Sequence, residues 1–140
     1  MSIVLHRLEM PVRWRDMDAF NHVNNASYLG YIEEARVTWL KSLSTDWDGE
    51  QAAPILAAIS VNYRRPLAWP ESIVVELSAE RVGSKSLTVN HRILSSGLPE
   101  MLYADGHSVL VWVNRQGQTV MLPDKVRTTA TGPDRIDDQD

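Results

Sequence analysis

The sequence has 140 residues, of which 44% are hydrophobic and 23% charged, and its formal net charge is −4. This length predicts a single domain, and the composition is ordinary for a soluble globular protein. Because the chain contains no cysteine, a disulfide framework, a thiolate zinc site and a cysteine nucleophile are excluded. No apolar run reaches the ~18 residues of a membrane span, and no basic block marks a nucleic-acid binder. We expect a cytoplasmic protein without a cofactor, metal, membrane or nucleic-acid partner.

The first element predicted along the chain is a half-buried strand over residues 3–15. Apolar and charged side chains alternate there, and the residues expected on the buried face are Leu8, Met10, Val12 and Trp14. This period of two is typical of a strand, and Pro11 indicates an edge position or a bulge because proline cannot donate to a ladder. Turn-forming and small polar residues over 16–25 then predict a loop.

A helix is predicted from Ala26 to about Leu43, where apolar residues recur at spacings of three and four. Asn24 or Asn25 is the expected N-cap, since an asparagine side chain accepts hydrogen bonds from the free N–H groups of a helix start. Apolar side chains surround most of this helix, so we expect it to be buried on most sides.

Alternating segments in the second half of the chain predict at least four meandering strands, over residues 57–64, 73–80, 87–93 and 101–113, with a short one at 120–122. The predicted fold class is therefore α+β, with one antiparallel sheet and one main helix against it. One helix cannot cover both faces of such a sheet, so we expect a second subunit to cover the rest. The polar residues 128–140 predict a disordered tail, which leaves residues 1–127 as the domain.

The loop between the first strand and the helix is the best candidate for a reactive site. Within ten residues it carries Asp16, Asp18, His22 and three asparagines, and it leads into a helix N-terminus. Free N–H groups at such a terminus can hold a carbonyl oxygen as it becomes anionic, while a carboxylate attacks the carbon or activates a water. A thioester suits this equipment because its thiolate leaves without a strong general acid. The same residue types also serve as caps and turn formers, and their spacing alone favours that structural role.

Residues 13–36, which read RWRDMDAFNHVNNASYLGYIEEAR, resemble the signature of the hotdog-fold thioesterases of the 4-hydroxybenzoyl-CoA thioesterase superfamily. The shared features are an Asp-x-Asp loop, a His-Val-Asn-Asn stretch and a Tyr-x-Glu-Glu-Ala-Arg helix. The resemblance implies a hotdog fold, in which a five- to six-stranded antiparallel sheet wraps one long central helix. It also implies an acyl-CoA thioesterase that releases a free acid and CoA and acts as a homodimer or homotetramer.

The resemblance also implies roles for individual residues. Asp18 matches the family's catalytic carboxylate, a nucleophile or general base, and Asp16 is expected to hold the loop. The oxyanion contact falls on the backbone N–H of Asn25, seven positions after Asp18, and His22 is expected to assist. One sister group has a tyrosine and a histidine where this chain has Trp14 and Asn25, so the roles of those two residues do not transfer.

Lys85 is the candidate for binding the CoA phosphates, since some relatives use a basic cluster before the fourth strand and this chain keeps one lysine there. A helix carboxylate is a minor alternative to Asp18, and Glu33 is expected to be buried and bonded to the Asp16 loop. Two other functions stay open. One is a hotdog hydratase or dehydratase, disfavoured by the short spacing of Asp18 and His22 and by the lack of a following proline. The other is a non-catalytic domain that binds acyl thioesters.

Overall fold

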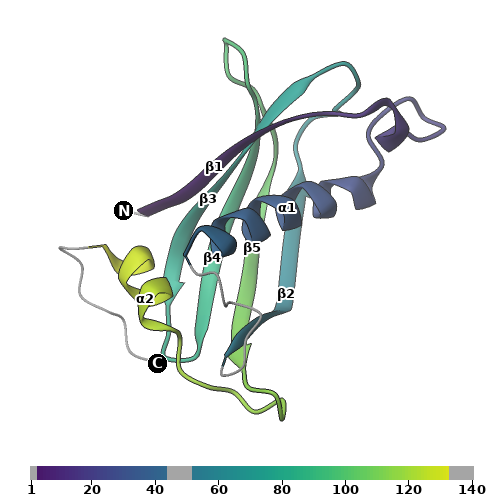
Figure 1. The fold of residues 1–140 in the computed structure, drawn as a ribbon. Coiled ribbons are helices and arrows are strands. Elements are labelled where there is room, and N and C mark those ends of the chain that lie inside the picture. Colours follow the sequence, from purple (N-terminus) through teal and green to yellow (C-terminus); the bar gives the residue numbers. More distant parts are fainter. Residues whose placement is uncertain (1–2, 44–51, 133–140) are drawn as a thin grey trace.

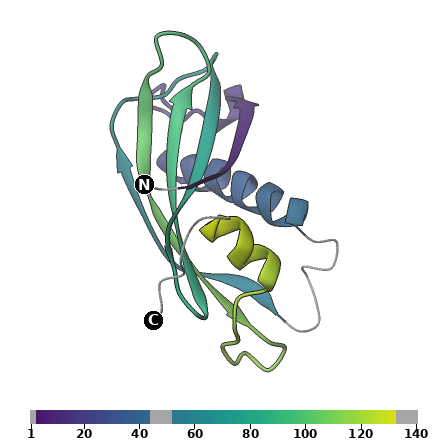
Figure 2. The same ribbon diagram turned by 90° about the vertical axis from the view of Figure 1, so that its left-hand side faces the viewer.

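Five antiparallel strands and two α-helices make up the fold in the computed structural model, which describes residues 3–43 and 52–132. The strands lie in one sheet in the order β1-β3-β4-β5-β2. Their bounds are β1 Ile3–Pro11, β2 Ala53–Tyr63, β3 Ser72–Val82, β4 Ser86–Ser95 and β5 Leu102–Val113. The helices are η1 Trp14–Asp16, a single 3-10 turn, α1 Asn25–Leu43 and α2 Asp124–Thr131. Both α-helices lie on the same side of the curved sheet (Figures 1 and 2). The predicted α+β class with one antiparallel sheet is confirmed.

The helix predicted over residues 26–43 is observed as α1, which begins at Asn25. Asn24 caps it, because its side-chain Oδ1 accepts a hydrogen bond of 2.8 Å from the Ala26 N–H. The side chains that α1 buries include Tyr28, Ile32, Ala35, Trp39 and Leu40. Burying a large apolar side chain contributes about 1.5–3 kcal/mol, so this stripe fixes how α1 sits on the sheet.

Regular alternation along β3 and β4 separates the two faces of the sheet. Every second residue is buried from Ile73 to Ala79 in β3 and from Leu87 to Ile93 in β4. The register pairs Leu77 with His91, and His91 with Gly106 of β5. Side chains of paired residues project from the same face, so one largely apolar layer runs across these three strands. The α-helices pack on this layer.

Strand β2 does not follow the predicted meander. It pairs with β5 at one edge of the sheet, whereas β3, the next strand in the chain, lies beside β1 at the other. The connection over residues 64–71 therefore crosses between the edges and passes the start of α1 (Figure 1). There the Val23 N–H donates a 2.7 Å hydrogen bond to the Leu67 carbonyl. This crossover places the 64–71 segment against the loop that carries the two aspartates.

Two local expectations are wrong. Trp14 is 72% exposed instead of lying on the buried face, because β1 ends at Pro11 and η1 begins at Trp14, which breaks the alternation. Residues 120–122 form no strand, and a single bridge joins Val113 to Thr119 in this region. Neither α-helix of the described residues is long and apolar enough to cross a membrane.

Helix α2 overturns part of the expected disordered tail. It packs on β1 and β3, and its buried side chains are Val126, Ala130 and Thr131. The Arg127 guanidinium donates a 2.6 Å hydrogen bond to the Gly83 carbonyl at the β3–β4 turn. Residues 128–131 thus belong to the packed domain, and residues 133–140 of the expected tail lie outside the described part of the chain.

Candidate active site

The loop that joins η1 to α1 is a tight antiparallel turn. Met17 and Val23 form a bridge, and inside it the Asp18 N–H donates to the His22 carbonyl at 2.9 Å. The Asn21 N–H in turn donates to the Asp18 carbonyl at 3.0 Å. Asn21 has a φ of 66°, a left-handed conformation that asparagine tolerates better than most residues. The loop sequence therefore folds the backbones of Asp18 and His22 side by side.

The Asp18 carboxylate is held at one oxygen only. Its Oδ1 accepts a 2.8 Å hydrogen bond from the Phe20 N–H, a local contact that fixes the orientation of the side chain. None of the described residues donates to the other oxygen, Oδ2. The carboxylate is half-buried, while the side chains of Phe20 and His22 are exposed beside it. One carboxylate oxygen is thus open to a substrate or a water.

Asp16 has a different environment, because it ties η1 to α1. Its Oδ2 accepts a 2.7 Å hydrogen bond from the Tyr31 hydroxyl and a longer one, 3.4 Å, from the Arg13 N–H. Its backbone carbonyl accepts a 2.8 Å bond from the N–H of the cap residue Asn24. Burial, followed by the hydrogen bond to Asp16, raises the pKa of Tyr31, so the phenol stays protonated and keeps donating. The carboxylate of Asp16 is therefore engaged in holding the loop to the helix.

The expectation that Glu33 is buried and bonded to this loop is wrong. Its side chain is 68% exposed and lies 4.0 Å from the Arg36 guanidinium. Tyr31 makes the contact instead. Residues two apart on an α-helix point about 200° apart, so Tyr31 and Glu33 cannot face the same loop. The sequence analysis missed Tyr31 because it counted this residue as apolar helix surface. Its hydroxyl, a hydrogen-bond donor on the helix that follows the acidic loop, was the signal that could have indicated the contact.

The first turn of α1 keeps an open backbone donor. Asn24 engages the Ala26 N–H with its side chain at 2.8 Å and the Ser27 N–H with its carbonyl at 2.9 Å. Neither bond uses the Asn25 N–H, and the first N–H groups of a helix have no acceptor within the helix. From β2, the Tyr63 hydroxyl donates a 3.1 Å bond to the Asn25 carbonyl. The sheet therefore supports the helix start, while no described residue accepts a hydrogen bond from the Asn25 N–H.

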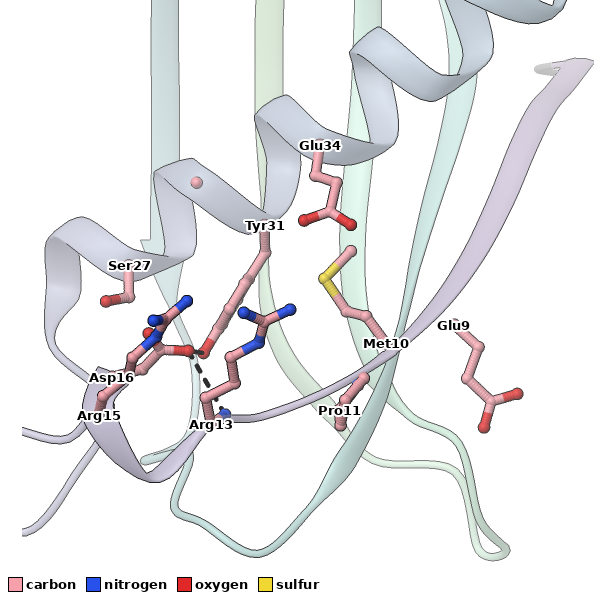
Figure 3. A pocket seen from close by; sticks show the side chains of 10 residues that line it. Glu9, Met10, Pro11, Arg13, Arg15, Asp16, Ser27, Tyr31 and Glu34 are labelled. Atoms are coloured by element: carbon pink, nitrogen blue, oxygen red, sulfur yellow. Dashed lines mark hydrogen bonds between the residues drawn. The ribbon is translucent and has the colours of Figure 1, made fainter.

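A cavity of about 450 Å³ lies between the end of β1, η1 and the first half of α1. Its lining includes Asp16 and Tyr31, joined by their hydrogen bond, and the side chains of Arg13 and Arg15 beside them (Figure 3). Asp18 does not line it. The cavity thus lies on the Asp16 side of the reactive loop.

Comparison with known proteins decides the family. The family model described as the thioesterase-like superfamily matches residues 12–129. The chain belongs to this superfamily. Its membership identifies the chain as a thioester hydrolase.

Three relatives show how closely this thioesterase resembles known ones. It is 48% identical to a candidate acyl-CoA thioesterase from Xanthomonas campestris, with 85% of this chain and 99% of that one covered and a TM-score of 0.76. It is 34% identical to the long-chain acyl-CoA thioesterase FadM of Escherichia coli over 80 residues. These residues cover 56% of this chain and 61% of FadM. It is 32% identical to a thioesterase from Thermus thermophilus complexed with coenzyme A and Zn, with 93% and 94% covered and a TM-score of 0.78.

The predicted site residues of this thioesterase fall in two places. Asp18 and His22 lie side by side in the turn, and Asn25 begins α1 three residues after His22. Lys85 does not join them within one chain, because it lies in the β3–β4 turn at the far end of β3. A strand of this length spans about 35 Å. In the described residues, no three histidine or carboxylate side chains converge to hold a metal ion.

Proposed function

We propose that the chain hydrolyses acyl-CoA thioesters to a free acid and CoA, with Asp18 as the essential carboxylate. The junction of loop and helix supports this proposal. No described residue donates a hydrogen bond to Asp18 Oδ2, and Asn25, seven residues later, begins α1 with a backbone N–H from which no described residue accepts a hydrogen bond. The matches to acyl-CoA thioesterases, and to a thioesterase complexed with coenzyme A, support the substrate class.

In the proposed reaction, the Asn25 N–H donates to the thioester carbonyl oxygen as that oxygen becomes anionic. In one route Asp18 takes a proton from a water, and the water oxygen attacks the carbonyl carbon. The carbon–sulfur bond then breaks, and the thiolate of CoA takes up the proton from Asp18. In the other route an Asp18 oxygen attacks the carbon, the thiolate leaves, and a water hydrolyses the resulting anhydride. Both routes end in the free acid and CoA.

His22 takes an assisting role in this proposal. Its backbone is bonded to that of Asp18, and its exposed side chain lies on the same turn. Because the thiolate leaves without a strong acid, the reaction does not depend on the imidazole. The alternatives, a hydratase or dehydratase and a non-catalytic acyl-thioester binding domain, release no thiol.

We also propose the hotdog arrangement, in which α1 is the central helix and a homo-oligomer completes the site. Among the described strands β2 has a neighbour, β5, on one side only, and its Ile55 and Leu56 side chains are 50% and 43% exposed; both observations support an assembly through this strand. An exposed apolar edge strand is a template for pairing with another chain. The cytoplasmic location stays a prediction.

The test of this function measures thiol release from a panel of acyl-CoAs by the wild type, Asp18→Asn and Asp16→Asn. Asp18→Asn keeps the shape and removes the charge, so it should fold normally and lose about 10²-fold or more in turnover. Asp16→Asn should mainly lower the melting temperature, because it weakens the bond from Tyr31. Asp124→Asn, an exposed position on α2, is the matched control and should behave as wild type. Near wild-type turnover by Asp18→Asn would contradict the assignment.

A further inference from the structure

The cavity between β1, η1 and α1 has a cationic end. Arg13 and Arg15 both line it, and neither guanidinium forms an ion pair with any described residue (Figure 3). Other arginines of the fold are paired: Arg92 with Glu76 at 2.8 Å and Arg64 with Asp105 at 3.0 Å. Two adjacent guanidinium groups at one cavity are therefore left with open donors.

At this end of the cavity two guanidinium groups face one carboxylate, that of Asp16, so the charge of the η1 end is positive (Figure 3). Asp16 accepts hydrogen bonds from the Tyr31 hydroxyl and the Arg13 backbone, and Glu34 and Glu9 line the other part of the cavity. The Glu9 carboxylate points away from both guanidinium groups (Figure 3). A ligand that suits this arrangement carries its negative charge at the η1 end and a neutral portion elsewhere.

Phosphate is the anion that matches two such groups, because the planar guanidinium presents its N–H donors in a fork that fits phosphate oxygens. The position also fits a CoA thioester, whose phosphates are separated from the reacting sulfur by the pantetheine arm. Arg15 and Arg13 precede Asp18 by three and five residues, which limits their Cα separations from it to about 11 and 18 Å. Lys85, at the far end of β3, has no comparable position within the chain.

We propose that Arg13 and Arg15 bind phosphate groups of the coenzyme A portion of the substrate, in the cavity between β1, η1 and α1. This inference rests on the proposed acyl-CoA hydrolysis. It assigns the phosphate contacts to η1 instead of the β3–β4 turn.

A binding experiment tests the site without catalysis. Adenosine 3′,5′-bisphosphate, which carries phosphates but no thioester, is titrated into the wild type and the double variant Arg13→Gln/Arg15→Gln by calorimetry. We expect the double variant to bind at least about 10-fold more weakly, since hydrogen bonds to charged groups are the strong ones. Arg115→Gln, exposed in the hairpin after β5, is the control and should bind as wild type. Unchanged binding by the double variant, or loss of binding on Lys85→Gln alone, overturns the proposal.

A kinetic experiment separates the phosphate contact from a disturbed loop. The same variants are compared on an acyl-CoA and on the N-acetylcysteamine thioester of the same acid, which has no phosphate. The double variant should raise KM for the acyl-CoA about 10-fold, leave kcat unchanged and leave the truncated thioester unaffected. Equal losses on both substrates mean that the loop is disturbed and overturn the proposal, as does no change on either. If the wild type releases no thiol from either substrate, the proposed function fails, and the bisphosphate titration still decides the phosphate site.

Discussion

His91 is a buried imidazole in the middle of the sheet. It is 1% exposed and lies opposite Gly106, where an added Cβ would come within 2.8 Å of its Nε2 atom. The glycine therefore provides the space that the ring occupies. Burial is the main cause that lowers the pKa of His91 to about 4; His107 and Arg36 lower it further, and Asp105 opposes them. The neutral imidazole is thus the form that the folded protein favours.

This residue predicts a loss of stability in mild acid. The unfolded chain takes up a proton on His91 near its ordinary pKa of about 6.5, whereas the folded chain takes it up only near pH 4. The contribution of neutral His91 to the free energy of unfolding is fully present above about pH 6.5. It is lost as the pH falls to 4, a change on the order of 3 kcal/mol. Urea unfolding of wild type and His91→Gln, from pH 7 to 4.5, measures this contribution. We expect the difference in unfolding free energy between wild type and His91→Gln to shrink as the pH falls. A difference that stays constant with pH would contradict the prediction.

At the scale of elements, α2 helps to hold the β3–β4 turn. The Val126 and Ala130 side chains of α2 are buried, and its Arg127 guanidinium donates a hydrogen bond to the Gly83 carbonyl. The helix is short, so its stability comes from this packing and not from helix propensity. Removing part of α2 therefore exposes apolar surface on β1 and β3.

Truncation measures what α2 contributes. A chain ending at Arg127 keeps only the first four residues of α2, too few for a stable helix, so the packing of Val126 and Ala130 is lost together. We expect a loss of about 2–3 kcal/mol in unfolding free energy, roughly one large buried side chain. A chain ending at Gly132 keeps all of α2 and is the matched control; residues 133–140 are predicted to be dispensable. Chemical denaturation of both truncations and the full chain provides the comparison. Equal stability of the two truncations would show that α2 contributes little.

At the scale of the whole molecule, the position of β2 at the edge of the sheet predicts a dimer or a dimer of dimers. Light scattering should then give a mass of two or four times 15.8 kDa. Leu56→Lys places a charge at this edge and should shift the mass toward a monomer. Met121→Lys, at a site 59% exposed outside the sheet, is the control and should leave the assembly unchanged. A stable wild-type monomer under assay conditions would argue against an interface at β2.

Features that depend on local repeats could be predicted from the sequence alone. The bounds of α1 follow from apolar spacing and the cap at Asn24, and the strands from alternation, because the helical repeat of 3.6 and the strand repeat of 2.0 are written directly in the residue order. The loop with Asp16 and Asp18 could also be located, since turn formers and acidic residues gather within ten positions. These features need no knowledge of distant parts of the chain.

Contacts between distant segments were decided by the tertiary structure. Asp16 meets Tyr31 because of how α1 is turned on the sheet, and β2 reaches the edge beside β5 because its connection crosses past the helix start. Helix α2 is held by surface on β1 and β3 that its own polar sequence does not reveal. In each case the free energy comes from burial and hydrogen bonding between groups far apart in the chain, and local periodicity carries no information about which distant group will be the partner.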